Sequence, residues 1–358
     1  MKTTSIKTIG ILTSGGDAPG LNATIRALCI SAKENYGIKL VGIRNGYKGL
    51  IENDTFSLDD YDFSSLLASG GTFLGTSRVK PFKNPEKDPK TGLLPIEAIK
   101  ETFKKNKLDA LVCLGGNGTN STASMLAKEG FNVIGLPKTI DNDIAETEVT
   151  FGFHTAIDIA TQGIDFNKTT AKIHGRVMCV EIMGHKAGWL ALYSGIAAAA
   201  DVILLPEIPY DIKKVAKSIK DSKKDFAVVV VAEGAMSKKE AKLDKKAFKK
   251  ARAEMKTTIS ARVAKEIEEE TGIETRASVL GYIQRGAEPS AYDRILATQF
   301  GTAAAEFIAK KEFGILVGMK NNKIVGIPLD KVEGKVKNIP EDFDLIQTAR
   351  QEGISFGD

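Results

Sequence analysis

Residues 8–34 read TIGILTSGGDAPGLNATIRALCISAKE and contain the clearest indication of the fold. The run Thr8–Thr13 does not alternate between apolar and polar residues, which is typical of a strand buried on both faces of a parallel sheet. Glycines in the turn Ser14–Gly20 let the backbone approach a phosphate, and a helix starting at Leu21 offers free N–H groups. Two adjacent glycines are about as typical of a tight turn without a ligand as they are of a phosphate-binding site. The stretch therefore predicts a strand–turn–helix unit and leaves the phosphate site open.

The same alternation of short apolar runs and helical patterns continues along all 358 residues. Further strands are expected at Lys39–Arg44, Asp109–Leu114, Asn132–Leu136, Val177–Ile182, Val202–Leu205, Phe226–Ala232, Ala277–Leu280 and Ile315–Met319. Helices are expected at Leu21–Glu34, Asn120–Lys128, Thr155–Asn167, Leu190–Ala199, Lys245–Glu269 and Ala291–Lys310. This order predicts an α/β fold with doubly wound, mainly parallel sheets. In such folds ligands bind at the carboxyl ends of the strands.

Composition and charge exclude several classes of protein. Hydrophobic residues make up 42% of the chain, and 50 basic residues stand against 45 acidic ones, so the surface is mixed rather than basic. The densest run of lysines, Lys238–Lys250, contains Glu240 and Asp244 and does not alternate with aromatic residues, so we expect no nucleic-acid partner. The apolar stretch Ile196–Leu205 is broken by Asp201 and falls short of a membrane span.

The three cysteines are Cys29, Cys113 and Cys179, far apart and each among apolar residues. Without a CxxC pair, they suggest neither a zinc site nor a disulfide framework. We expect buried, reduced thiols in a cytoplasmic protein. The polar amino terminus shows no signal peptide.

Two more glycine-rich segments strengthen the case for phosphate binding. Leu114–Asn120 (LGGNGTN) follows an apolar strand and precedes a helix, for which Thr119 would be a suitable N-cap. Asn117 stands where an acidic residue is common in such loops, and its neutral oxygen can still contact a hydrated Mg²⁺. Gly70–Arg78 (GGTFLGTSR) ends in a cation that could bind transferring phosphates.

A pair of carboxylates follows the strand expected at Asn132–Leu136. In the segment Pro137–Asp143 (PKTIDND), Asp141 and Asp143 are two residues apart and would point the same way on an extended chain. Paired carboxylates near a polyanion make sense if one is a general base and the other positions it or a metal. An Asx turn with exposed aspartates is the alternative for this segment in isolation.

Taken together, these segments resemble the phosphofructokinase family. The matching motifs are TSGGDAPGLNA, GGTFLGTSR, GGNGT, PKTIDND, VEIMG (Val180–Gly184), TRASVLGYIQRG (Thr275–Gly286) and YDR (Tyr292–Arg294), in the family's order over nearly the whole chain. The resemblance implies Mg²⁺-assisted phosphoryl transfer from ATP to the C1 hydroxyl of fructose 6-phosphate, giving fructose 1,6-bisphosphate in glycolysis.

The resemblance also assigns roles to individual residues. Asp141 would be the base, supported by Asp143 and Lys186, and Asn117 would lie at the magnesium position. The phosphate donor would contact Gly16, Arg78, Gly118 and Thr119. The sugar phosphate would be bound by Thr139, Met183, Gly184, Glu233, Tyr282 and Arg285, with Arg176 and Arg276 reaching across from a neighbouring subunit. Without this resemblance, salt bridges beside a strand would be the expected role of those two arginines.

The resemblance implies two similar domains with the active site in the cleft between them. Residues 1–151 with about 283–334 would bind the donor, and about 152–282 with 335–358 would bind the sugar phosphate. Shared sites imply a homodimer or homotetramer. A basic or polar effector site looks eroded, since Arg26 is kept but other residues stand at its remaining positions: Ile30, Asp60, Asp225 and Phe226. We therefore expect weak or absent control by nucleotide and phosphoenolpyruvate effectors.

The chain departs from the family pattern in ways that leave alternatives open. His185 and Lys186 replace an arginine that is common after Met-Gly, and a lysine does not reproduce its bidentate fork. In the family, a lysine at the place of Lys138 is usual in pyrophosphate enzymes, yet it occurs in some ATP enzymes. A glycine at the place of Gly118 goes with ATP, because an aspartate there blocks the α-phosphate and goes with pyrophosphate. We weight Gly118 more and predict ATP. A pyrophosphate-dependent transferase and a non-catalytic sugar-phosphate-binding paralogue remain the alternatives, and sedoheptulose 7-phosphate is not excluded as a second acceptor.

Overall fold

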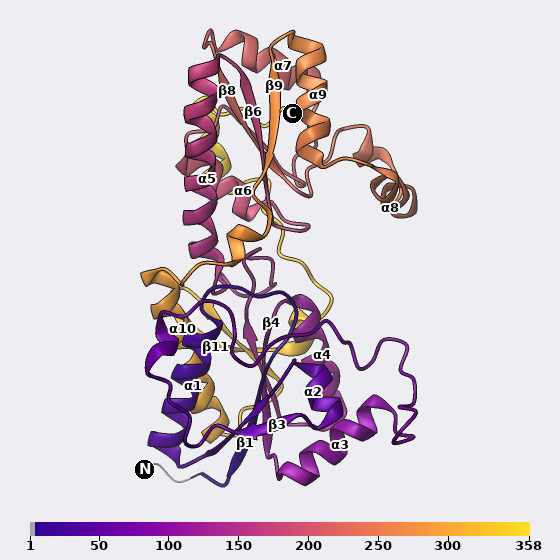
Figure 1. The fold of residues 1–358 in the computed structure, drawn as a ribbon, viewed down its shortest axis with the longest axis vertical. Coiled ribbons are helices and arrows are strands. Elements are labelled where there is room, and N and C mark those ends of the chain that lie inside the picture. Colours follow the sequence, from indigo (N-terminus) through magenta and orange to yellow (C-terminus); the bar gives the residue numbers. More distant parts are fainter. Residues whose placement is uncertain (1–3) are drawn as a thin grey trace. The chain divides into compact units, whose positions relative to one another are not determined.

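The computed structural model describes residues 4–358, which divide into two compact units (Figure 1). Unit 1 comprises the chain up to Ile140 with Ile144–Thr155 and Arg285–Val336, and unit 2 comprises Asp141–Asp143, Ala156–Gln284 and Lys337–Asp358. Each unit has its own sheet with helices on both faces, so the predicted α/β class is confirmed.

The sheet of unit 1 has the strand order β11-β10-β5-β4-β1-β2-β3. Its strands are β1 (Thr8–Thr13), β2 (Lys39–Ile43), β3 (Thr55–Ser57), β4 (Ala110–Gly115), β5 (Val133–Pro137), β10 (Ile315–Lys320) and β11 (Lys323–Pro328). The strands from β10 to β2 are parallel, and β3 and β11 add antiparallel edges. Every residue of β1, β4 and β5 is buried, as their continuous apolar runs predict.

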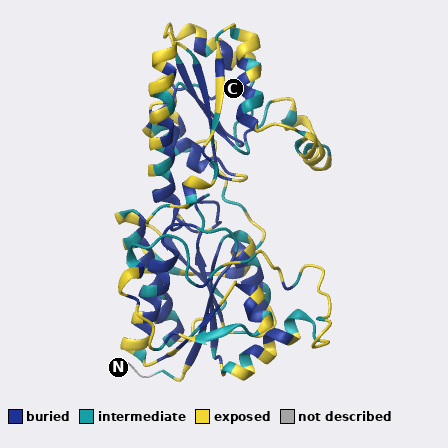
Figure 2. Cartoon of the chain, viewed as in Figure 1, coloured by how far each residue is buried: buried dark blue, intermediate teal, exposed yellow. Residues whose placement is uncertain are grey.

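Helices cover both faces of this sheet (Figure 1). They are α1 (Leu21–Tyr36), α2 (Tyr47–Glu52), α3 (Pro95–Asn106), α4 (Asn117–Lys128), α10 (Ala291–Ala309) and α11 (Leu329–Val332), with the 3₁₀ turn η1 (Ser64–Leu67). Helices α1 and α10 pack on one face and α2, α3 and α4 on the other. Figure 2 shows the buried strands between the helices. A hydrophobic core cluster that includes Leu12 and Leu111 of the sheet and Leu126 of α4 packs between the sheet and the helices.

The sheet of unit 2 is parallel, with the strand order β7-β8-β6-β9. The strands are β6 (Val177–Ile182), β7 (Val202–Leu204), β8 (Ala227–Ala232) and β9 (Thr275–Val279). The helical elements are α5 (Phe153–His174), α6 (Trp189–Ala197), α7 (Ile212–Asp221), η2 (Glu240–Lys242), α8 (Lys245–Glu254), α9 (Ile259–Thr271), η3 (Gly281–Arg285) and α12 (Asp344–Gln351). Helix α5 begins in unit 1 and continues into unit 2.

One predicted helix was wrong, and one hairpin was not predicted. The single helix expected at Lys245–Glu269 is two helices, because Thr258 ends the gap between them as the N-cap of α9, accepting from the N–H of Ala261 at 3.2 Å. The strands β10 and β11 form an antiparallel hairpin that was not foreseen. Its turn residues Asn321 and Asn322 have φ angles of 50° and 58°, the conformation that a two-residue hairpin turn requires.

The expected burial of the cysteines is confirmed. Cys29, Cys113 and Cys179 are all free thiols in the core. Burial raises the pKa of Cys113 to about 12 and the pKa values of the other two thiols still further, so all three stay protonated. Across residues 4–358 no helix is long and apolar enough to cross a membrane.

Candidate active site

The first glycine-rich turn connects β1 to α1 at the carboxyl end of the sheet in unit 1. Gly20 is the N-cap of α1 with a φ of 95°, a conformation that favours glycine. Gly16 lies against the guanidinium of Arg285, where a Cβ would clash. Arg285 also donates from Nη1 to the carbonyl of Asp17 at 3.2 Å. The turn therefore brings together two predicted ligands, Gly16 and Arg285, that are far apart in sequence.

The third glycine-rich segment, Gly70–Arg78, is fastened to this first turn. The backbone N–H of Gly15 donates to the carbonyl of Ser77 at 3.0 Å, and the Thr76 hydroxyl donates to the carbonyl of Gly15 at 2.6 Å. Asn22 holds the other end through the carbonyl of Gly70. Because these bonds fix the backbone on both sides, the exposed side chain of Arg78 starts from a defined position beside the turn.

The second glycine-rich turn connects β4 to α4 and touches the first. The prediction that Thr119 is an N-cap was wrong, because α4 begins two residues earlier, at Asn117, with Gly116 as its N-cap. Thr119 lies inside the first turn of α4, buried, and donates from Oγ1 to the carbonyl of Ser14 at 3.2 Å. The two phosphate-binding candidates are therefore joined by a direct hydrogen bond.

Lys138 links the same two turns from a third strand. Its side chain is buried, and Nζ donates to the carbonyl of Gly16. Its backbone N–H donates to the carbonyl of Gly115 at 3.1 Å. A Cβ added at Gly118 would meet only the end of the Lys80 side chain, with Cε and Nζ both at 3.6 Å. Unit 1 thus places Gly118 beside open space and uses the ammonium of Lys138 to hold Gly16.

Asp141 and Asp143 were expected to lie on an extended segment, but the backbone between them is turned. Asn142 between them has a φ of 50°, which turns the backbone and removes the simple alternation of side chains. Asp143 is buried, and its carbonyl accepts from the N–H of Lys337 at 2.8 Å, while Asp141 is only partly buried. Lys337 Nζ also donates to Asn142 Oδ1 at 3.1 Å. Of the two carboxylates, Asp141 has the better access to a substrate.

In unit 2 a carboxylate organises the loop after β6. Glu233 follows β8, and its Oε1 accepts from the N–H of Gly184 at 3.1 Å and from the N–H of His185 at 2.5 Å. His185 adopts a φ of 53°, and a Cβ at Gly234 would lie 2.5 Å from the carbonyl of His185. Three residues picked out from the sequence, Gly184, His185 and Glu233, therefore form one rigid turn at the carboxyl ends of β6 and β8.

A cavity of about 130 Å³ opens beside this turn. Its lining includes the predicted sugar ligands Met183, Glu233 and Tyr282, together with Glu181 and Ile182 of β6, Val279 of β9 and Gly281 of η3. The Tyr282 side chain is 77% exposed, so its hydroxyl is accessible to a ligand. Lys186 is exposed in the same loop.

The two arginines predicted to reach across subunits lie elsewhere in unit 2. Arg176 precedes β6 and Arg276 is near the start of β9, at the amino ends of these strands. Both pair with Glu274, Arg176 at 3.5 Å and Arg276 at 2.7 Å. Since Glu233 lies at the opposite, carboxyl ends of the strands, the chain does not bring these arginines to its own cavity.

Sequence reasoning missed three residues that support the site. Gln284 is fully buried, and its Oε1 accepts from the N–H of Met183 at 3.3 Å. Glu207 accepts from the N–H of Gly188, the N-cap of α6, at 3.0 Å, and burial raises its pKa. Asp293 accepts from the backbone N–H groups of Gly152 at 2.9 Å and Thr155 at 2.7 Å. The position of Gln284 inside IQRG and of Asp293 inside YDR was the available signal.

Few side chains of unit 1 could contact a magnesium ion. Among residues 4–358 no group of three or more His, Cys, Asp or Glu side chains could hold a metal ion. Asn117 adds a single amide at the start of α4. Mg²⁺ commonly keeps several waters and is shared between one or two protein oxygens and substrate phosphates. A single amide at this position is compatible with a Mg²⁺ that is also bound by the donor's phosphates.

Comparison with known proteins agrees with this arrangement. The family described as Phosphofructokinase matches residues 8–308. The ATP-dependent 6-phosphofructokinase of Spirochaeta thermophila is 53% identical over 100% of both chains, and the pyrophosphate–fructose 6-phosphate 1-phosphotransferase of Amycolatopsis methanolica is 41% identical over 93% of this chain and 96% of its own. The crystal structure of Pichia pastoris phosphofructokinase in the T-state has a TM-score of 0.78 at 31% identity over 92% of this chain, which spans 35% of that longer one.

Proposed function

The chain belongs to the phosphofructokinase family, and we propose that it transfers the terminal phosphoryl group of ATP to the C1 hydroxyl of fructose 6-phosphate. The observation that carries the proposal is the hydrogen bond from Thr119 to Ser14, which joins two glycine-rich turns at the carboxyl end of one sheet. Two such turns at helix amino ends suit a polyphosphate better than a single phosphate. The reaction belongs to glycolysis, which we place in the cytoplasm, where thiols such as Cys113 stay reduced.

The sugar phosphate has its candidate site in unit 2. Met183, Glu233 and Tyr282 line the cavity there, and the carboxylate and phenol oxygens suit the hydroxyl groups of a sugar. The loop from Gly184 is fixed by Glu233, so this site is formed before a ligand binds. Thr139 is assigned to the same substrate on the family pattern alone.

In the proposed reaction, Asp141 accepts the proton of the C1 hydroxyl as that oxygen bonds to the γ-phosphorus. The bond from this phosphorus to the bridging oxygen breaks, and ADP leaves with the electron pair. Arg78 and Lys186 contribute positive charge, which spreads the charge of the transferring group. A Mg²⁺ bound with the donor, next to Asn117, would neutralise phosphate charge.

Gly118 favours ATP over pyrophosphate as the donor. The space at this position admits the α-phosphate of a nucleotide, since only the flexible end of Lys80 is within 4 Å of an added Cβ. Lys138 favours pyrophosphate on the family pattern. Its buried ammonium, however, already bonds to Gly16, which gives it a structural role with either donor.

The test is phosphorylation of fructose 6-phosphate with Mg²⁺, run in parallel with ATP and with pyrophosphate. We expect turnover with ATP and at least about tenfold less with pyrophosphate. Turnover with pyrophosphate alone would contradict the donor assignment and leave the family intact. Binding of fructose 6-phosphate without turnover from either donor would identify a non-catalytic paralogue.

We also propose that the chain self-associates and that Arg176 and Arg276 serve the sugar site of a neighbouring copy. Two apolar residues of unit 2 are exposed: Phe166 on α5 is 66% exposed, and Val279 on the edge strand β9 is 49% exposed. An exposed apolar residue on an unpaired edge strand, such as Val279, is typical of an interface.

Coexpression of Asp141→Asn and Arg276→Ala chains tests the shared site. Each variant alone should be nearly inactive. Mixed assemblies should regain activity, because one site then has an intact Asp141 and an intact partner arginine. Activity of the mixture that stays at the sum of the two variants would contradict a shared site.

A further inference from the structure

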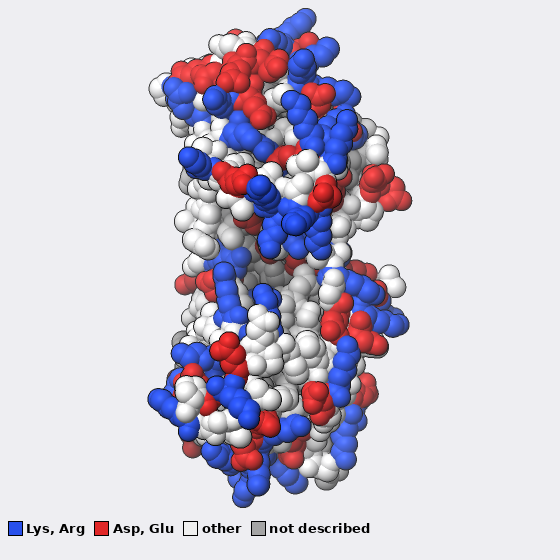
Figure 3. All heavy atoms as spheres, turned by 90° about the vertical axis from the view of Figure 1, so that its right-hand side faces the viewer, with Lys and Arg blue, Asp and Glu red and all other residues white. Residues whose placement is uncertain are grey.

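A basic arm projects from unit 2. We define it as residues 242–256, which carry seven basic and two acidic side chains. Its helix α8 (Lys245–Glu254) stands away from the rest of the unit in Figure 1, and no side chain of α8 is buried. Figure 3 shows basic side chains gathered on the face from which α8 projects. A ten-residue helix without a buried face is marginal in water.

The arm is attached to unit 2 mainly at its root. Arg252 donates to the carbonyl of Ala235, pairs with Glu240 at 3.1 Å and lies over the ring of Phe248. Lys245, Lys246, Lys249 and Lys250 lie outside these contacts, on the exposed surface of α8. Arg252 therefore orients α8, and the lysines of the helix are exposed to solvent, with Lys250 also 3.8 Å from Glu254 in the same helix.

The charges on α8 and α9 oppose the dipoles of their own helices. Lys245 and Lys246 occupy the first turn of α8, where the positive end of the helix disfavours cations. The stretch Glu266–Glu274, which includes the end of α9, has five glutamates near the negative end of the helix, which disfavours anions. Four of them pair with Arg262, Lys265 or Arg276 at 2.7–3.9 Å, so neighbouring cations offset part of this charge. The charge that these ion pairs do not offset would be neutralised by an oppositely charged partner outside each helix.

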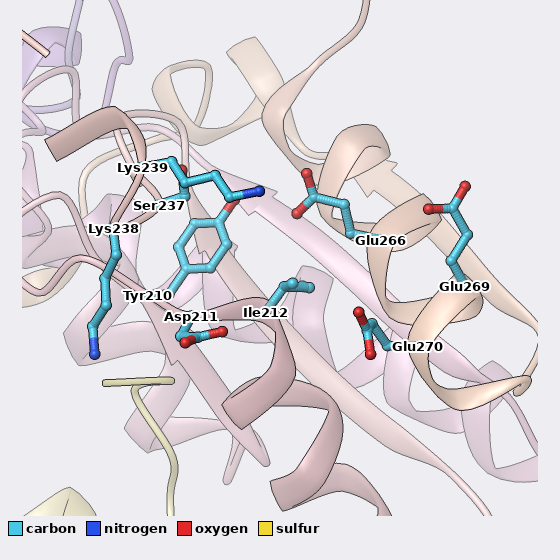
Figure 4. A pocket seen from close by; sticks show the side chains of 9 residues that line it. All are labelled: Tyr210, Asp211, Ile212, Ser237, Lys238, Lys239, Glu266, Glu269 and Glu270. Carbon is cyan, nitrogen blue, oxygen red and sulfur yellow. The ribbon is translucent and has the colours of Figure 1, made fainter. Parts of the chain in front are cut away.

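A hollow of about 320 Å³ lies beside α9. One side carries the carboxylates of Glu266, Glu269 and Glu270, and in Figure 4 the Lys239 side chain passes beside the Tyr210 ring and points toward Glu266. The full lining is Tyr210, Asp211, Ile212, Ser237, Lys238, Lys239, Glu266, Glu269 and Glu270. Four carboxylates against two ammonium groups give the hollow a net negative charge.

We propose that α8 of one copy docks on the acidic hollow of a second copy, with lysines of the helix paired to Glu269 and Glu270. Charge complementarity favours α8 of a second copy as the binding partner of the hollow. The helix carries five basic side chains and one acidic one, and the hollow has four carboxylates and two ammonium groups. The hollow of the same chain is an unsuitable partner for α8, because α8 projects away from unit 2 (Figure 1). Docking would cover the exposed faces of both helices and neutralise the charges that oppose their dipoles.

Charge reversal in the full-length protein tests this interface. The arm variant carries Lys245→Glu, Lys246→Glu, Lys249→Glu and Lys250→Glu, and the hollow variant carries Glu269→Lys and Glu270→Lys. Native mass is measured by sedimentation velocity at about 0.05 and about 0.5 M NaCl. We expect at least about tenfold weaker association of each variant, and restoration when the two are mixed, since the reversed charges again match.

A crosslink identifies the contact directly and does not depend on the reversals. Chains with Lys249→Cys and chains with Glu269→Cys are mixed and oxidised, the native thiols being buried. A disulfide-linked mixed dimer is expected, whereas neither variant alone should form it efficiently. Unchanged mass of both reversed variants would overturn the proposal. So would an arm that binds RNA or anionic vesicles while the mass stays the same and no mixed crosslink forms.

Discussion

The candidate sites of the two units occupy the same position relative to their sheets, but one consists mainly of backbone groups and the other mainly of side chains. In both, the site follows the carboxyl ends of parallel strands. Unit 1 uses backbone: glycine-rich turns held together by hydroxyl groups such as that of Thr119 and by the ammonium of Lys138. Unit 2 uses side chains: Glu233 fixes the loop at Gly184, and Met183 and Tyr282 line the cavity.

This difference determines how each unit can select its substrate. Backbone N–H groups at helix ends recognise phosphate charge whatever molecule carries it, so donor choice must come from the space left around the turns. Side-chain carboxylates and phenols recognise the pattern of hydroxyls on one sugar. Substitutions in unit 1 should therefore change which donor is used, and substitutions in unit 2 should change the affinity for the acceptor.

Asp141→Asn should have the largest effect, because it removes the proposed base and leaves both binding surfaces in place. We expect kcat to fall by about 10³-fold while the KM values for ATP and fructose 6-phosphate stay within about threefold. Steady-state kinetics and calorimetric binding of fructose 6-phosphate provide the measurement and its control. A variant that keeps most of its kcat would show that another group takes the proton.

Gly118→Asp tests donor choice by space in unit 1. The added Cβ would meet only the end of Lys80, and an acidic residue in the first turn of α4 suits the helix dipole, so the fold should tolerate it. We expect kcat/KM for ATP to fall about 100-fold, since a carboxylate would repel the α-phosphate, and kcat/KM for pyrophosphate to fall much less. Gly118→Ala, with no charge, is the matched control. Equal losses for both donors would break the comparison.

Glu233→Gln tests the side-chain site of unit 2. The amide keeps one acceptor for Gly184 and His185 but loses the charge that strengthens both hydrogen bonds. We expect KM for fructose 6-phosphate to rise about tenfold, with KM for ATP unchanged. If KM for ATP rises as much as KM for the sugar, the two units do not divide the substrates as proposed.

Much of the fold could be predicted because its signals are local. The apolar runs at Thr8–Thr13 and Val177–Ile182 became strands with those bounds, since residues buried on both faces of a sheet leave a continuous pattern. The missed hairpin between β10 and β11 depends on two asparagines in the left-handed region, a choice that the pattern of apolar residues does not show. The break between α8 and α9 was hidden because helical periodicity continues through it.

The site was predictable where motifs carry it and less so where distant segments meet. Glu233 could be picked out as an acid ending an apolar strand. That Arg285 packs on Gly16, or that Thr119 bonds to Ser14, depends on contacts between residues far apart in sequence. The expectation for the aspartates failed because one residue between them, Asn142, has a positive φ angle.

Asp293→Asn should reduce stability in unit 1 more than any substitution considered for unit 2. The buried carboxylate accepts from the N–H groups of Gly152 and Thr155 and from the Thr155 hydroxyl at 2.5 Å, which fixes the start of α5. An amide can replace one oxygen of this set, so we expect a loss of about 2 kcal/mol. Thermal unfolding gives the size, and hydrogen exchange should show faster opening at residues 152–157. Uniform exchange across both units would contradict a local role.

Glu207→Gln is expected to have the smallest effect, visible mainly as a change with pH. Burial raises the pKa of Glu207, although the N–H groups of Gly188 and Ile339 partly oppose the shift. A raised pKa means that folding favours the protonated form. Its contribution is therefore fully present below the unfolded pKa of about 4.3 and is lost as pH rises through the folded value. The stability of the wild type relative to the glutamine variant should fall over this window, measured by urea unfolding at several pH values. A relative stability that rises with pH would mean that the hydrogen bonds outweigh burial, and that the carboxylate of Glu207, like that of Glu233, holds its loop best when ionised.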